Sequence, residues 1–545
     1  MKKLKINIKL FLLSLFVMSQ FSCNEDILNV EPVNEFLSSN FFQTEDQVFS
    51  ALVAAYDPVG WSMAYGQWIS YIMYGEIRSD NANAGGDASD NDQPGWQELD
   101  DFRNTNTNTI VQPMYRRCYI GIFRATTVIE VDNPNLDAAL VDQYKAEAKF
   151  LRAYYHFELF KNFGPIPVVQ ELLAPDQVDL SRSTMTEVFT AITEDLEAAI
   201  PLLPISVSSS ETGRVTQGAA LAMLGKAYLY WADMDGDDSA KFDKAAENLQ
   251  KVVDFGIYDL LDDYQSLFGF NVKNTQESVF EVQHNPLYTS DWGWFEGIDG
   301  NGVVQLCGIR GLCGDHPDYQ AGWGFMIPTA GLWNHFKSDD AYRKDVTLCD
   351  EAELQAEIEA AGGSCSPVID QTQSNPIDYT GYFNEKYQNF KSYEGTNVNG
   401  GDPNLTKDGN TYIIRYADVL LMLAEALHRG SGADGTAMNY IDMVRERAAG
   451  PGDNTGNFRT AQDLMNDEGM SLLDVIWYER RAEFAMEGDR WHDLVRSGRA
   501  NADLFAGDPL RSGNFEAKHL WIPISLEELS VATNLTEYPD ANLFQ

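Results

Sequence analysis

The segment TQGAALAMLGKAYLYWAD, residues 216–233, decides the fold of this chain. Apolar side chains recur in it at three-to-four spacing, which predicts a helix. The spacing of Leu221, Leu224, Gly225 and Tyr228 matches the Leu-Gly-x-x-Tyr pattern of the first helix of a tetratricopeptide repeat. A repeat of this kind buries its apolar face only by stacking on a neighbour, so further helix pairs are expected.

The pattern returns elsewhere along the chain. Residues 242–254 supply a second repeat helix after an insertion, and residues 414–428 and 438–449 form another pair. Small residues at Gly225 and Ala424 allow two helices to approach closely. Further helices are predicted over residues 120–130, 144–162, 186–200 and 472–486, and a short strand over 278–283. Long Gly-, Asn- and Asp-rich segments separate them: residues 75–108, 285–328 and 365–411. The expected fold is mainly α-helical, with long irregular loops and a few short strands.

The N-terminus has the pattern of an export signal. Lysines precede an apolar run over residues 10–18, which is too short to span a bilayer, and Ser22 stands directly before Cys23. We therefore expect a signal peptide over residues 1–22 and lipid attachment at Cys23, followed by a tether up to residue 42. An ordinary cleaved secretion signal is the alternative.

Charge excludes some partners. The chain has 82 acidic and 39 basic residues and a formal charge of −43. Phosphate backbones and anionic lipid surfaces repel such a polyanion, so nucleic acid is excluded and the membrane is contacted only through the lipid.

Cysteines and acidic residues are the candidates for disulfides, metal sites and catalysis. Cys307 with Cys313, and Cys349 with Cys365, could form disulfides, which leaves Cys118 as a buried thiol. Asp233, Asp235 and Asp237 are weak candidates for calcium ligands, because the glycine among them is misplaced for an EF-hand loop. A solvated turn is the favoured interpretation of this run. No zinc, phosphate-loop or nucleophile motif is present, so no cofactor is expected. The charged block at 479–499 is interpreted as a buried ion network, in preference to a catalytic carboxylate pair.

Several short blocks stand out along the chain: residues 23–28 (CNEDIL), 44–46 (TED), 151–155 (LRAYY), 163–167 (FGPIP), 213–220 (GRVTQGAA), 414–421 (IRYADVLL), 479–484 (ERRAEF), 487–491 (EGDRW) and 520–524 (LWIPI). Together, and in this order, they resemble the SusD/RagB family of Bacteroidetes outer-membrane lipoproteins.

The resemblance implies a SusD-like helical domain over residues 43–545, with an N-terminal part to about 260 and a C-terminal part from about 270. It also implies a surface-exposed, outer-membrane lipoprotein that is not an enzyme. Such a protein captures oligo- or polysaccharide and passes it to a SusC-like TonB-dependent barrel. Three alternatives stay open: a peptide-capturing RagB-like protein, a surface glycoside hydrolase and a protein-assembly scaffold.

Aromatic side chains in the irregular segments are the candidates for sugar contacts. An indole held toward solvent by polar loops can stack on the apolar face of a pyranose, while polar groups at its edge bind the hydroxyls. Packing of the same rings against the helices is the alternative for each tryptophan. The candidate ligand-binding residues are Trp68, Arg78, Asp80, Asn81, Trp96, Trp292, Trp294, Phe295, Arg310 and Trp323.

Overall fold

The computed structural model describes residues 41–89, 91–270, 272–284, 300–370, 377–393, 402–451 and 458–537. The predicted signal peptide, Cys23 and the tether as far as residue 40 lie outside the described residues. Within the described ranges, no helix is both long enough and apolar enough to cross a membrane.

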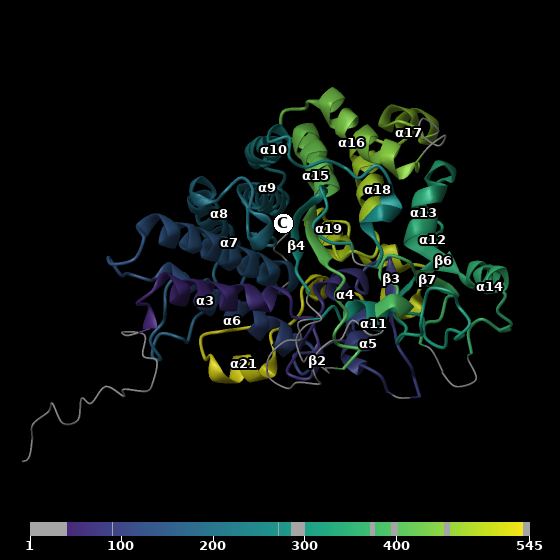
Figure 1. Cartoon of the computed structure of the whole chain (residues 1–545), viewed down its shortest axis with the longest axis horizontal. Coiled ribbons are helices and arrows are strands. Elements are labelled where there is room, and N and C mark those ends of the chain that lie inside the picture. The colour runs from purple at the N-terminus through teal and green to yellow at the C-terminus, as the bar shows by residue number, and fades with distance from the viewer. Residues whose placement is uncertain are drawn as a thin grey trace, which may run out of the picture.

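The long helices stack on one another largely in chain order. Helix α6 packs between α3 and α7, the row continues through α8, α9 and α10, and α15 then joins α10 to α16 and α18. Figure 1 shows α3 and α6–α10 on one side of the molecule and α15 and α16 at the top. Their bounds are α3 Glu45–Tyr56, α6 Val111–Ile129, α7 Ala138–Phe163, α8 Met185–Ala199, α9 Gln217–Met234, α10 Ser239–Asp254, α15 Tyr416–Arg429, α16 Asp434–Ala448 and α18 Leu472–Phe484. The prediction of a mainly helical fold is confirmed.

Local sequence sets where these helices begin and end. Thr184 caps α8: its hydroxyl accepts from the Glu187 N–H at 3.2 Å, and the Glu187 carboxylate accepts from the Thr184 N–H at 2.6 Å. This capping box satisfies two amides that the first helical turn would otherwise leave unpaired. Helix α7 ends at Gly164, whose φ of 67° favours glycine.

Close packing of α9 on α10 depends on the predicted small residue. A Cβ atom placed on Gly225 would lie 2.5 Å from Cγ of Leu249, which is fully buried on α10. The tetratricopeptide-like contact between these two helices is therefore present where the sequence pattern places it.

Short antiparallel strand pairs join segments that are far apart in the sequence. Strand β3 pairs with β5 and β4 pairs with β8, while β1–β2 and β6–β7 form two further pairs. The bounds are β1 Met63–Ala64, β2 Gln67–Trp68, β3 Ala82–Gly85, β4 Ser278–Val282, β5 Phe325–Pro328, β6 Leu348–Asp350, β7 Tyr382–Asn384 and β8 Thr411–Arg415. The β3–β5 pair holds the first irregular segment against the second.

Short helices cover the irregular side of the molecule. Helices α12, α13 and α14 lie on the right in Figure 1, beside β6 and β7. The bounds are α4 Tyr71–Glu76, α5 Pro94–Asp100, α11 Val303–Cys307, α12 Ala330–Trp333, α13 Ala341–Thr347, α14 Glu351–Ala360, α17 Ala461–Glu468, α19 Arg490–Arg496, α20 Pro509–Asn514 and α21 Leu526–Val531.

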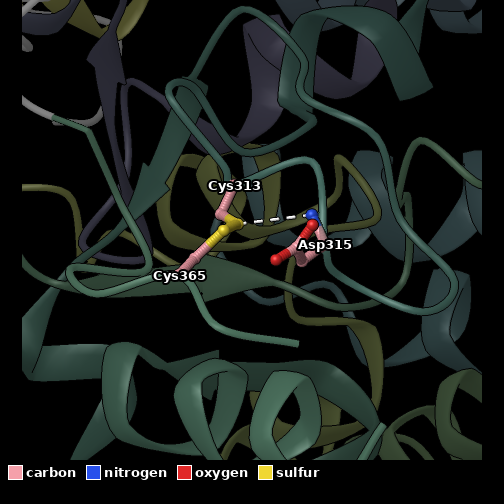
Figure 2. Close-up of side chains that lie close together, drawn as sticks. All are labelled: Cys313, Asp315 and Cys365. Carbon is pink, nitrogen blue, oxygen red and sulfur yellow. Dashed lines mark hydrogen bonds between the residues drawn. A yellow bond between two sulfur atoms is a disulfide. The ribbon is translucent and has the colours of Figure 1, made fainter. Parts of the chain in front are cut away.

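A satellite core under α14 contains the disulfide, and the pairing differs from the expected one. Cys313 is bonded to Cys365, whereas Cys307 and Cys349 are free and buried, as is Cys118. Figure 2 shows the bond, with the Asp315 N–H donating to the Cys313 sulfur at 3.3 Å. The Cα atoms of the bonded pair lie 6.3 Å apart. The thiol of Cys307 belongs to the main core instead, so nearness in sequence did not indicate the partner.

The charged block of the C-terminal part is a buried ion network, as predicted. Glu483 is fully buried and contacts the guanidinium groups of Arg343, Arg415 and Arg447. Burial alone would raise the pKa of Glu483, but these three cations outweigh it and bring the pKa to about 2. Glu479 is buried beside Arg343 and, at 2.7 Å, Arg445. The ion pairs of both carboxylates therefore hold α13, α16, α18 and β8 together.

Candidate ligand-binding site

Two of the candidate tryptophans lie in the core. Trp96 on α5 is fully buried, and its ring meets that of Tyr74 edge-on at 4.7 Å. Trp68 on β2 is 4% exposed. The expectation of solvent-facing indoles is wrong at both positions. Each segment lies directly on the helices, so neighbouring side chains cover its indole ring.

Trp323 is the candidate tryptophan that keeps accessible surface among the described residues. It is half-buried and lies edge-on to Trp68, with ring centroids 5.4 Å apart. Gly302 lies under Trp68, because a Cβ atom there would come within 2.3 Å of the indole. Trp68 therefore acts as a support that fixes the position of Trp323.

Three aromatic candidates, Trp292, Trp294 and Phe295, lie outside the described residues. The described chain resumes at Gly300, whose carbonyl accepts from the Ser62 hydroxyl at 3.4 Å. Gly302, two residues further on, packs on Trp68.

Arg78 faces the interior and is a structural residue. Its Nη2 donates to the carbonyls of His519 and Leu520 at 3.1 and 3.0 Å, and the guanidinium lies 4.8 Å from the Trp491 ring centroid. Burial lowers the pKa of Arg78 to about 9. With 1% of its surface exposed, Arg78 is not available to a ligand at the surface, which corrects the expectation from the sequence.

Asp80 and Asn81 fasten the first loop to the last helices. Asp80 accepts from Arg490 at 2.8 Å and pairs with Arg481 at 3.0 Å. Burial would raise the pKa of Asp80, but the two guanidinium groups hold it below its usual range. Asn81 is fully buried, donates to Glu76 at 3.0 Å and accepts from Arg481 at 2.9 Å. Their polar groups are thus used within the protein, as those of Arg78 are.

Arg310 lies at the edge of Trp323. Its Nη1 donates to the Trp323 carbonyl and to the carboxylate of Asp92, both at 3.1 Å, and its Nε lies 3.3 Å from a carboxylate oxygen of Asp87. Asp87 and Asp92 were missed by the sequence reasoning. The signal that could have found them is the acidic stretch between Gly86 and Pro94, within the first irregular segment.

The β3–β5 pair brings these groups together. Gly85 pairs with Phe325, and a Cβ atom on Gly85 would lie 2.3 Å from the Gly324 carbonyl oxygen. With a φ of +74°, this position favours glycine on two grounds. The loop that follows β3 therefore lies against the segment before β5. We call Trp323, Arg310 and Asp92, together with the buried Trp68 and Asp87 that contact them, the Trp323 surface.

In the acidic run at the end of α9, each of the three predicted calcium candidates pairs with a basic side chain. Asp233 pairs with Arg496 at 2.7 Å and with Arg429, Asp237 also pairs with Arg429, and Asp235 pairs with Lys241. In the described part of the chain, the one group with metal-like spacing is Cys313, Asp315 and Cys365. Its two sulfur atoms are bonded to each other, so neither is a thiolate that could hold a metal.

Comparison with known proteins decides the family. Residues 26–229 match the family described as "Starch-binding associating with outer membrane", and residues 276–540 match the SusD family. A solved "Laminarin binding SusD-like protein" is 31% identical to this chain, with a TM-score of 0.75. The match covers 91% of this chain and 100% of the solved one. This chain belongs to the SusD family. The predicted family and its association with the outer membrane are confirmed, and so is the prediction that this SusD-family protein is not an enzyme.

Two further relatives show how far the likeness extends. SusD-like protein P2 of Formosa agariphila is 27% identical over 545 residues, which cover 98% of this chain and 99% of the relative. Surface glycan-binding protein A from Bacteroides thetaiotaomicron, solved in complex with laminarihexaose, is 24% identical with a TM-score of 0.77. That structure covers 91% of this chain and is covered to 99%, so the two share a fold over nearly their whole length.

Proposed function

We propose that this SusD-family protein captures an oligosaccharide or polysaccharide at the cell surface and leaves it chemically unchanged. The observation that carries the proposal is the Trp323 surface. The half-buried indole of Trp323 offers a flat apolar wall, and the partly exposed side chains of Arg310 and Asp92 supply charged groups near it, while the buried Asp87 holds Arg310 in place. Apolar walls with a few polar groups are the usual composition of a small-ligand site, and an indole face fits the C–H face of a pyranose.

Laminarin is the first ligand to test. Relatives of this chain are named or solved as binding laminarin or laminarihexaose, and the fold extends over almost the whole chain. The strong negative charge of the protein disfavours sulfated or uronate-rich glycans in comparison with neutral ones.

Delivery and anchoring complete the proposal. A lipid on Cys23 would hold the body at the outer membrane, and a SusC-like TonB-dependent barrel would receive the captured glycan. Binding by stacking and hydrogen bonding alone gives affinities of roughly micromolar to millimolar at an exposed site, which suits release to a transporter.

Calorimetric titration with a glycan panel that includes laminarin tests the proposal. We expect Trp323→Ala to weaken binding at least about tenfold, because it removes the stacking wall. Trp333→Ala is the matched control: one face of that half-buried indole stacks on Tyr382 at 4.4 Å, and the Lys344 Nζ lies 3.3 Å from its centroid. Trp333→Ala should therefore leave glycan affinity unchanged.

Three other results would contradict the proposed function. If the wild-type protein binds no glycan but binds peptides tightly, the peptide-capturing alternative is correct. Sustained release of reducing sugar by the purified protein would establish the hydrolase alternative. Equal loss of affinity in the Trp323 and Trp333 variants would remove the Trp323 surface from the site.

A further inference from the structure

An apolar groove on the opposite side of α6 from α3 has no role in the proposed function. It has a volume of about 360 Å³ and lies between α6, residues 167–180 and the residues that follow α21. Figure 1 shows α21 beside α6, and the Arg116 Nε donates to Glu528 of α21 at 2.6 Å. The walls are mainly aliphatic and aromatic, with Tyr119, Ile122 and Leu180 among them.

Large apolar side chains on the groove are unusually exposed. Phe123 is 62% exposed, Val178 57% and Leu172 40%. A single exposed apolar residue is ordinary, but several around one groove indicate a surface that another group covers.

The composition of the groove indicates which kind of molecule covers it. A glycan needs partners for its hydroxyls, yet the Tyr119 hydroxyl already donates to the Pro167 carbonyl at 2.7 Å. An anionic lipid surface would meet Glu171 and Glu528 on the groove and a net charge of −43. An apolar peptide segment fits both observations.

The described chain begins beside one end of the groove. The Phe42 carbonyl accepts from the Asn133 side chain at 2.8 Å, and Asn133 lies shortly after the end of α6. At that same end of α6, the Glu130 carboxylate accepts from the Leu172 N–H at 2.6 Å. The residues that precede Phe41 therefore start close to the Leu172 end of the groove.

We propose that residues 27–37 of this chain, ILNVEPVNEFL, lie in the groove. Their apolar side chains recur about every three residues, at Ile27, Val30, Val33 and Phe36. A polyproline II helix has three residues per turn, so these four side chains would share one edge of it, and residues 30–36 would span roughly 19 Å. The twelve residues of helix from Tyr115 to Thr126 along the groove span roughly 16 Å, so residues 30–36, the middle of the segment, match the groove in length.

Docking of residues 27–37 sets the height of the body above the membrane. An extended chain from Cys23 to Phe41 reaches roughly 60 Å, but only roughly 13 Å of chain separate Cys23 from Ile27. The height of the body above the membrane depends on lipid attachment at Cys23. Binding of residues 27–37 in the groove does not depend on it.

Cross-linking of the full-length, membrane-anchored protein tests the contact. Phe36→Cys combined with Leu172→Cys should react with a short bismaleimide at least about tenfold faster than Phe36→Cys combined with Met443→Cys. Met443 is 40% exposed on α16, at the top of Figure 1, and serves as the matched control. Equal rates for the two pairs would overturn the proposal.

Proteolysis supplies an independent measurement. The double variant Phe123→Asp/Val178→Asp places charges in the groove at exposed positions, so the fold should persist. A glutamate-specific protease should then cut after Glu35 at least about fivefold faster than in the wild type, whereas Pro32 blocks cleavage after Glu31 in both. The control Leu202→Asp/Ile205→Asp changes exposed side chains elsewhere and should leave cleavage unchanged.

Other occupants give different results, and each of them overturns the proposal. A second copy of the chain would produce cross-links between molecules, in proportion to protein concentration. A transporter barrel as occupant would make protection of the segment depend on the barrel. Glycan affinity should stay unchanged in the groove variants, so failure here is distinguishable from failure of the proposed function.

Discussion

Glu76 shows how one buried carboxylate couples the first loop to the last helices. It is fully buried and accepts from the Asn81 side chain at 3.0 Å and from the Gly488 N–H at 2.8 Å. Burial raises the pKa of Glu76 to about 7, despite these hydrogen bonds. The protonated form is therefore favoured in the folded state, and the group titrates near neutral pH.

Replacement by glutamine should remove this titration. Because the folded-state pKa lies above the unfolded value, the stabilisation is fully present below about pH 4.5 and is lost as the pH rises through about 7. Between pH 5 and pH 8, we expect the unfolding free energy of the wild type to fall by about 2–3 kcal/mol more than that of Glu76→Gln. Denaturant titrations at the two pH values measure the difference. Parallel pH profiles would show that Glu76 does not titrate in this range.

At the scale of elements, contact between α9 and α10 depends on one missing side chain. Gly225→Val places atoms where Leu249 already packs, so we expect the free energy of unfolding to fall by about 1–3 kcal/mol. Gly435→Ala on α16 is the control, because a Cβ atom there meets nothing within 4 Å and alanine favours a helix. Thermal unfolding should separate a destabilised variant from one that is neutral or slightly stabilised. Equal melting temperatures would contradict the close approach.

The Cys313–Cys365 disulfide stabilises the satellite core under α14. It closes a loop with a sequence separation of 52, for which chain entropy predicts a stabilisation of up to about 4 kcal/mol. Reduction should therefore speed amide exchange in α14 and leave α7 protected, as hydrogen-exchange mass spectrometry can measure. A Cys313→Ser/Cys365→Ser variant should exchange faster without reductant and show no further response to it. A reductant effect that persists in this variant would assign the change to another group.

At the scale of the whole molecule, the ion network ties the C-terminal helices to β8. Glu483→Gln leaves Arg343, Arg415 and Arg447 without their shared carboxylate, so we expect a loss of about 3–5 kcal/mol in unfolding free energy. The control Glu247→Gln removes an exposed pair with Lys251 and should change stability by less than about 1 kcal/mol. Denaturant unfolding measures the free energy of unfolding of the two variants. If both variants lose less than about 1 kcal/mol, the buried network contributes little to stability.

Short-range sequence patterns specify the helical scaffold and identify the family. Helix periodicity, the cap at Thr184, the stop at Gly164 and the small residue at Gly225 act over short stretches of chain, so residues within each stretch specify them. The buried ion network was also foreseeable, because charges that alternate with Phe484 and Trp491 can be buried only in pairs.

Contacts between distant parts of the folded chain set which tryptophan stays accessible and which cysteines bond. Trp96 and Trp323 both lie in polar, glycine-containing sequence, yet one is covered by Tyr74 and the other remains half-exposed beside Trp68. Likewise, Cys313 bonds to Cys365 in preference to the nearer Cys307. Exposure and bonding depend on distances across the fold, which the β3–β5 pair and the satellite core set, and these contacts join residues too far apart in sequence for a local pattern to specify.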